Sequence, residues 1–125
     1  MSSRADIGRR GEDVVCQYLT EHGHTILERN WRTGHLEVDI ISLDRDGVHF
    51  VEVKSRVAPV MASPEENVRQ EKQRRIAKAA GAYLRQKGSR LGDAEVWLDV
   101  AAVVFEGGTV NVEYFPAAYV PVFYR

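Results

Sequence analysis

Two apolar runs joined by a short turn constrain the fold of this chain more than any other feature. Residues 36–43 and 48–54 are rich in valine and isoleucine, and Asp46-Gly47 lies in the turn between them. Asp-Gly between two such runs is typical of a β-hairpin. We therefore expect two neighbouring antiparallel strands, in which successive side chains alternate between the two faces of a sheet.

The remaining patterns predict a layered α/β fold. Val15, Leu19 and His22 lie at helical spacing, and Gly23 follows where a helix needs a C-terminal cap. The order α-β-β-β-α-β-β predicts a mixed central sheet flanked by helices. The expected elements are a helix at 8–22, strands at 25–31, 36–43 and 48–54, a helix from a capping box at 63–66 to Gly88, and strands at 95–105 and 109–115.

Size and composition indicate one domain in a reducing compartment. The 125 residues suit a single domain spanning 1–125. No apolar run approaches the roughly 18 residues of a membrane span, and Cys16 is the only cysteine. We expect a cytoplasmic protein with no membrane partner.

Three charged side chains of the hairpin are expected on one face of the sheet. With a four-residue turn, Asp39 lies opposite Glu52; with a two-residue turn, Asp39 lies opposite Lys54. Directly opposed residues share a face, so both registers bring Asp39, Glu52 and Lys54 together.

This acid pair has two interpretations. Carboxylates that face each other in an apolar sheet repel, and a divalent cation such as Mg²⁺, which favours oxygen ligands, would offset both charges. Lys54 would then lie beside the metal and could position a water molecule. In the alternative, Asp39 and Glu52 form ordinary salt bridges with Lys54 and Arg56 on a solvent-facing surface.

A basic segment stands out in a chain whose net charge is −1. Residues 57–90 contain eight Lys and Arg but three Asp and Glu. Such a segment could follow a phosphate backbone, or it could be a solvated helix face. The residues with the predicted nucleic-acid role are Arg69, Lys72, Gln73, Arg74, Arg75 and Lys78.

The four histidines follow no zinc-binding motif. His22, His24, His35 and His49 show no HExxH spacing and have no cysteine partners. We expect them in surface turns.

Several motifs together resemble a known superfamily. In order along residues 9–84, the matching segments are Arg10-Gly11-Glu12, Glu28-Arg29-Asn30, Glu37-Val38-Asp39, Phe50-Val51-Glu52-Val53-Lys54-Ser55-Arg56 and Lys72-Gln73-Arg74-Arg75. The set resembles the PD-(D/E)xK nucleases, and within them the YraN-like family of small bacterial proteins, which is similar to archaeal Holliday-junction resolvases. The chain departs from the family at Gly34-His35-Leu36, where a glycine is usual nearer the acid.

The resemblance implies a restriction endonuclease-like fold and metal-dependent phosphodiester hydrolysis. It implies that Asp39, Glu52 and the carbonyl of Val53 bind Mg²⁺ or Mn²⁺, that Lys54 acts on the attacking water, and that Glu12 completes the site. Resolvases of this kind are dimers, so a homodimer is part of the expectation, although no sequence feature marks a dimer interface.

Two functional hypotheses follow. The first is a divalent-metal-dependent endonuclease that hydrolyses phosphodiester bonds in DNA, including branched DNA. The second is a module of the same fold that binds nucleic acid or a protein without cleavage. Metal titration and incubation with linear, nicked and four-way DNA distinguish the two.

Overall fold

The computed structural model describes residues 3–59, 70–87 and 91–118. Within them the chain forms the predicted mixed α/β fold in the predicted order. The capping box expected at residues 63–66 lies outside the described residues. The elements are α1 (Arg4–Glu21), β1 (Thr25–Thr33), β2 (Leu36–Asp44), β3 (Gly47–Val57), α2 (Gln70–Lys87), β4 (Val96–Glu106) and β5 (Thr109–Phe115).

The first helix begins earlier than its apolar spacing predicts. Ser3 and Asp6 form a capping box, in which the Ser3 hydroxyl accepts from the Asp6 amide at 3.1 Å. The cap satisfies amides that the first helical turn leaves without partners. The helix therefore starts at Arg4, four residues before the predicted start, because a local polar signal and not an apolar stripe sets this end.

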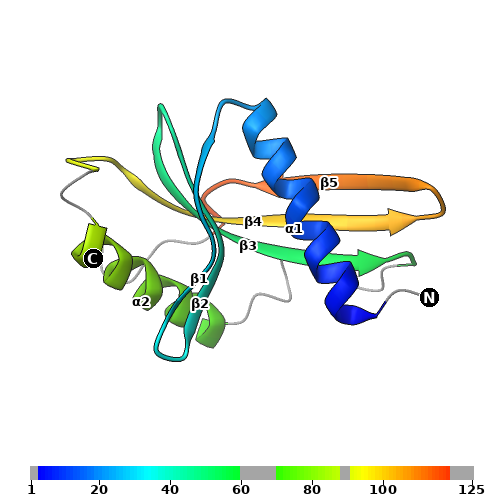
Figure 1. The fold of residues 1–125 in the computed structure, drawn as a ribbon, viewed down its shortest axis with the longest axis horizontal. Helices are drawn as coiled ribbons and strands as arrows, with labels where there is room; N and C mark the ends of the chain where they lie inside the picture. The colour runs from blue at the N-terminus through cyan, green and yellow to red at the C-terminus, as the bar shows by residue number, and fades with distance from the viewer. Residues whose placement is uncertain (1–2, 60–69, 88–90, 119–125) are drawn as a thin grey trace.

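The five strands form one sheet in the order β1-β2-β3-β4-β5 (Figure 1). β3 and β4 run parallel, and the other neighbouring pairs run antiparallel. The connection between the two parallel strands contains α2, as a parallel pair requires a crossover. No helix among the described residues is long and apolar enough to cross a membrane.

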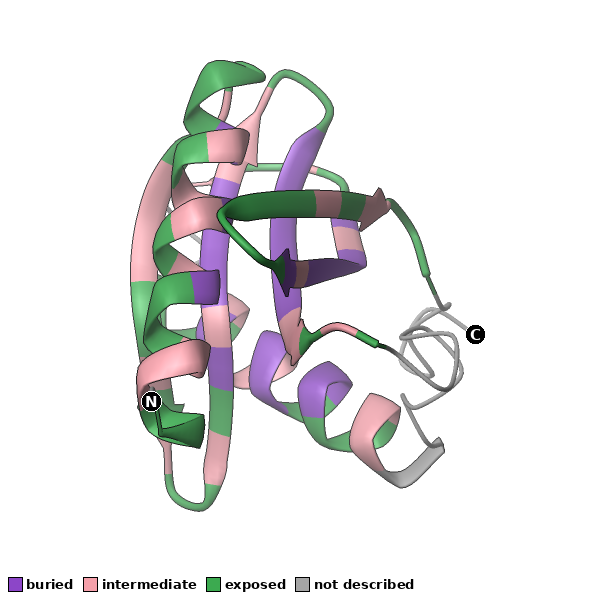
Figure 2. Cartoon of the chain, turned by 90° about the vertical axis from the view of Figure 1, so that its right-hand side faces the viewer, coloured by how far each residue is buried: buried purple, intermediate pink, exposed green. Residues whose placement is uncertain are grey.

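The two helices cover opposite faces of the sheet (Figure 2). Val15 and Leu19 of α1 pack with Ile40, Val51 and Val103. On the other face, α2 packs its alanines, Ile76 and Tyr83 against a second apolar cluster. The strand members of that second cluster are Val38, Ile41, Val48, Phe50, Val96 and Leu98.

The central hairpin opens at the end that carries the acids. Leu43 pairs with Val48, which is the register of the four-residue turn. The ladder between β2 and β3 ends at Ile40 and Val51, one pair before Asp39 and Glu52. β3 continues beside β4 as far as Val57, so β2 and β3 diverge and leave a wedge between them.

Candidate active site

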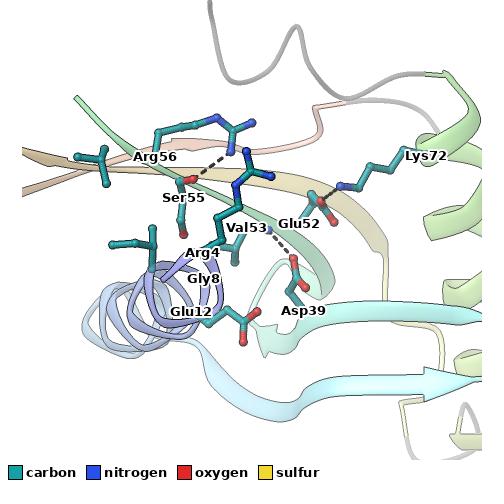
Figure 3. Close-up of a pocket in the computed structure, with 11 residues that line it drawn as sticks. Arg4, Gly8, Glu12, Asp39, Glu52, Val53, Ser55, Arg56 and Lys72 are labelled. Atoms are coloured by element: carbon teal, nitrogen blue, oxygen red, sulfur yellow. Dashed lines mark hydrogen bonds and ion pairs between the residues drawn. The ribbon is translucent and has the colours of Figure 1, made fainter. Parts of the chain in front are cut away.

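A cavity of about 700 Å³ occupies the wedge. Four elements supply its polar side chains: Glu12 comes from α1, Asp39 from β2, Glu52 from β3 and Lys72 from α2 (Figure 3). The structure therefore brings three predicted acidic residues to one place, although they are separated by as many as 40 positions in the chain. Asp39 and Glu52 share this cavity and do not point to opposite sides of the sheet.

Asp39 lies one residue beyond the last paired residues of β2 and β3. Its side chain takes the place of a backbone partner for β3. Its carboxylate accepts a hydrogen bond from the Val53 amide, with a nitrogen–oxygen distance of 2.8 Å. Burial, and next the charge of Glu52, raise the pKa of Asp39 from 3.8 to about 7, although the Val53 bond opposes the rise. The site therefore holds more negative charge than its own donors neutralise.

Glu52 is buried and has a cationic partner. Its side chain is 8% exposed, and its Oε1 atom lies 2.5 Å from the Nζ atom of Lys72 (Figure 3). Burial disfavours the charged form of Lys72. The hydrogen bond with Glu52 and the charge of that carboxylate outweigh burial and raise the pKa of Lys72. Lys72, which the sequence assigned to nucleic-acid contact, thus reaches the carboxylate pair itself.

Lys54, which was predicted to join the acids, does not line this cavity. It follows Phe50 and Glu52 at intervals of two along β3, and its amine interacts with both Glu52 and Lys72. Burial, and next the charge of Lys72, lower the pKa of Lys54. A lysine with a lowered pKa releases and accepts a proton more readily near neutral pH.

Glu12 reaches the cavity because of the glycine before it. A Cβ atom at Gly11 would lie 1.8 Å from the Ser55 hydroxyl of β3, so only glycine permits this approach of α1 to the strand. Burial raises the pKa of Glu12, and a hydrogen bond from Asn30 partly offsets the rise. The Arg10-Gly11-Glu12 motif thus combines a close helix–strand contact with an acid aimed at the wedge.

Two arginines that were not predicted as functional-site residues also line the cavity. Arg4 lies in the first turn of α1, and Arg56 lies on β3 four residues after Glu52. Arg56 follows the acid–lysine pair on the same strand, a signal that could have been used, whereas Arg4 has no such signal. Arg4 and Arg56 therefore place positive charge beside the acidic side chains of the cavity, from α1 and from β3 (Figure 3).

The basic residues of α2 divide into two groups. A smaller cavity of about 190 Å³ shares Asp39, Glu52 and Lys72 with the first, and Arg75 lines it. Arg74 and Lys78 are exposed and line neither of these cavities. Gln73 is half-buried. Arg69 lies outside the described residues.

The prediction of surface turns was wrong for two of the four histidines. His22 and His35 are exposed, as expected. His49 is 6% exposed and lies within β3, and His24 is half-buried between α1 and β1. Their imidazoles lie 4.6 Å apart between ring centres. No local motif revealed this pair, because its partners come from separate segments.

Comparisons with known proteins place the chain in a family. The model of the uncharacterised protein family UPF0102 matches residues 11–103. The chain belongs to the UPF0102 family. This confirms the expected YraN-like family. The matched span contains every predicted site residue from Glu12 to Lys78, and Arg4 precedes it.

Relatives in this family match nearly the whole chain. A UPF0102 protein of Bacteroides thetaiotaomicron is 36% identical over 97% of this chain and 98% of its own length. One from Anaeromyxobacter dehalogenans is 40% identical over 93% of this chain and 85% of its own. One from Rhodococcus jostii is 41% identical over 86% and 90%, respectively. The matches to these three relatives thus cover most of the residues that form the sheet and the wedge.

Proposed function

We propose that this UPF0102 protein is a divalent-metal-dependent endonuclease of the PD-(D/E)xK type that hydrolyses phosphodiester bonds in DNA. The observation that carries the proposal is the wedge in the sheet, where Asp39, Glu52 and Glu12 meet Lys72 in one cavity. The alternative interpretation, a solvent-facing set of ordinary salt bridges, fits these acids less well. Glu52 is buried, and the pKa of Asp39 is raised.

The donor set fits Mg²⁺ or Mn²⁺. Asp39 and Glu52 offer carboxylate oxygens, and oxygen ligands are those that both cations prefer. Val53 offers a carbonyl: its amide faces Asp39, and the amide and carbonyl of one strand residue point to the same side. A bound divalent cation would supply Lewis acidity at the phosphate and a more acidic water molecule.

Each side chain of the site would have a separate role in the reaction. Asp39 and Glu52 would hold the cation, and the hydrogen bond from the Val53 amide would fix the Asp39 carboxylate. Lys54, whose pKa is lowered by burial and by the charge of Lys72, accepts the proton of the attacking water or holds that water in line. Lys72, which pairs with Glu52 in this structure, would be free to contact a phosphate oxygen if a cation took its place beside that carboxylate. Arg4, Arg56 and Arg75 border the cavities and bind the flanking phosphates.

The test measures metal binding and cleavage in the same variants. The parent should cut linear, nicked or four-way DNA in the presence of Mg²⁺ or Mn²⁺. Asp39→Asn and Glu52→Gln should lower the cleavage rate by roughly 100-fold or more, because several kcal/mol of charge stabilisation depends on the bound cation. Calorimetry should show that both variants lose Mn²⁺ binding while their circular dichroism is unchanged.

Asp13→Asn is the matched control. Asp13 lies next to Glu12 on α1, but it is exposed and pairs with Arg29 at 2.7 Å. Its variant should cut like the parent. Cleavage that persists in Asp39→Asn and Glu52→Gln would refute the proposal. Salt-sensitive DNA retention without cleavage at any metal concentration would favour the non-catalytic binding module instead.

A further inference from the structure

A second polar cluster lies near the turn of the β2–β3 hairpin, away from the wedge. His24 precedes β1, Asp44 ends β2 and His49 is the third residue of β3. One ligand atom from each lies within 4.8 Å of the others. Glu52 lies three positions after His49 along β3, which corresponds to roughly 10 Å. The two sites therefore share a hairpin but not a cavity.

The Asp44 carboxylate lies close to the Nε2 atom of each histidine. The Nε2 atom of His49 lies 2.8 Å from Oδ1 of Asp44, and the Nε2 atom of His24 lies 3.2 Å from Oδ2 of the same carboxylate. The three side chains are 8–14% exposed. In a tetrahedral zinc site with bonds of about 2.0–2.1 Å, neighbouring ligand atoms lie about 3.3 Å apart. The two nitrogen–oxygen distances differ from this spacing by about 0.5 Å or less, and the three ligand atoms lie within 4.8 Å of one another.

The Nδ1 atom of each imidazole contacts a second polar side chain. The Nδ1 atom of His24 lies 2.9 Å from the Ser42 hydroxyl, and the Nδ1 atom of His49 lies 2.7 Å from the Asp99 carboxylate. Asp99 is fully buried. Histidines that bind a metal through one nitrogen usually donate the other N–H to a carboxylate or a similar acceptor. Both histidines of this cluster have that arrangement.

His49 is held between two carboxylates, one on each ring nitrogen. They belong to Asp44 and Asp99, and a neutral imidazole has one N–H to donate. Asp99 already accepts hydrogen bonds from the Tyr114 hydroxyl and from the Ala117 amide. With Nδ1 directed at Asp99, the Nε2 atom is the ring nitrogen that would face a metal ion shared with Asp44.

We propose that His24, Asp44 and His49 bind one Zn²⁺ ion and leave a fourth position open. Two imidazoles and one carboxylate suit zinc and disfavour Mg²⁺ and Ca²⁺, which select oxygen ligands. The ion would tie the end of α1 to β2 and β3, and Ser42 and Asp99 would orient its ligands. This site is independent of the endonuclease proposal, because none of its ligands lines the two cavities at the wedge.

The experiment uses the full chain, freed of metal and of any affinity tag, in excess Mg²⁺. Zn²⁺ titration should show one tight site and a raised melting temperature. Co²⁺ should give the visible absorption of a tetrahedral site with nitrogen and oxygen ligands. His24→Asn and Asp44→Asn should lose the site, and Ser42→Ala should weaken Zn²⁺ binding by roughly 10-fold, as expected for an outer partner.

Two controls make the outcome decisive. His35→Asn removes an exposed histidine outside the cluster, and Asp39→Asn disables the proposed Mg²⁺ site; both should bind Zn²⁺ like the parent. His24→Asn keeps the His49–Asp99 bond, so its metal-free fold should match the parent by circular dichroism. The proposal is overturned if the parent binds no stoichiometric Zn²⁺, or if His24→Asn and Asp44→Asn bind it as the parent does.

Discussion

At the scale of single residues, Asp39 shows how position and not identity gives a carboxylate its properties. Asp44 lies on the same strand, and hydrogen bonds from His49 and from the Asp46 amide outweigh burial and lower its pKa. Asp39 lies at the wedge, where burial and the charge of Glu52 raise its pKa. The two aspartates, five residues apart, therefore differ in the charge that they keep near neutral pH.

The raised pKa of Asp39 predicts a pH-dependent cost to stability. Between pH 3.8 and about 7, the folded chain holds a proton on Asp39 that the unfolded chain has released. The free energy of unfolding of the metal-free parent therefore falls as pH rises through this window. Asn does not titrate and keeps an oxygen for the Val53 amide. Metal-free Asp39→Asn should exceed the parent by roughly 1–3 kcal/mol at pH 8.

Urea denaturation in chelator at pH 4 and pH 8 measures this difference. At pH 4, Asp39 is protonated in the folded parent, so the two proteins should unfold at similar urea concentrations. A variant that is less stable than the parent at pH 8 would contradict the assigned cause.

At the scale of elements, the contact between α1 and β3 sets the place of Glu12. Gly11 meets Ser55 where β3 has left its ladder with β2, and the Ser55 hydroxyl is buried without a hydrogen-bond partner among the described residues. An unpartnered buried hydroxyl costs free energy. The close approach of helix to strand is therefore maintained at a local cost, at the point where the helix delivers an acid to the site.

A double-mutant cycle tests this contact. Gly11→Ala should destabilise the protein by roughly 1–2 kcal/mol, because overpacking against Ser55 exceeds the gain in helix propensity. Ser55→Ala alone should be nearly neutral or stabilising, since it removes an unpartnered hydroxyl. In the Ser55→Ala background the cost of Gly11→Ala should fall by about 1 kcal/mol.

Thermal and urea unfolding of the four proteins supply the cycle. Gly8→Ala is the control on the same helix, because a Cβ atom there meets nothing within 4 Å. It should leave stability unchanged or raise it. Equal costs of Gly11→Ala in both backgrounds would show that Ser55 is not the obstacle.

At the scale of the whole molecule, the distribution of charge matters more than its sum. The net charge is −1, yet Arg4, Arg56, Lys72 and Arg75 border the two cavities at the wedge. Focused positive charge around a cleft attracts a polyanion even when the protein is nearly neutral. The exposed Arg74 and Lys78 of α2 lie away from these cavities.

This distribution predicts which basic residues contact DNA, if the proposed function holds. Arg75→Ala should weaken binding to a short duplex and reduce the slope of log affinity against log salt by about 1. Lys78→Ala is the matched control on the same helix and should leave both unchanged. Fluorescence anisotropy at several salt concentrations, with Ca²⁺ in place of Mg²⁺, measures both quantities. An equal effect of Lys78→Ala would place the DNA along the solvent face of α2 instead.

The sequence by itself determined the elements and the sharing of faces. Apolar spacing predicted the five strands and the end of each helix to within a few residues, and Asp46-Gly47 predicted the central hairpin, whereas the predicted start of the second helix at 63–66 lies outside the described residues. Alternation along β2 and β3 predicted that Asp39 and Glu52 share one face, and both line the same cavity. These properties follow from local periodicity and turn chemistry, which act over a few residues and are therefore visible in the sequence.

Only the tertiary structure decided how distant segments meet. The ion pair of Lys72 with Glu52, the entry of Arg4 into the wedge, and the cluster of His24, Asp44 and His49 each join separate elements. Such contacts depend on where β2 leaves β3 and on how each helix packs on its face of the sheet. Packing decides them because no local pattern records the distance between side chains of different elements.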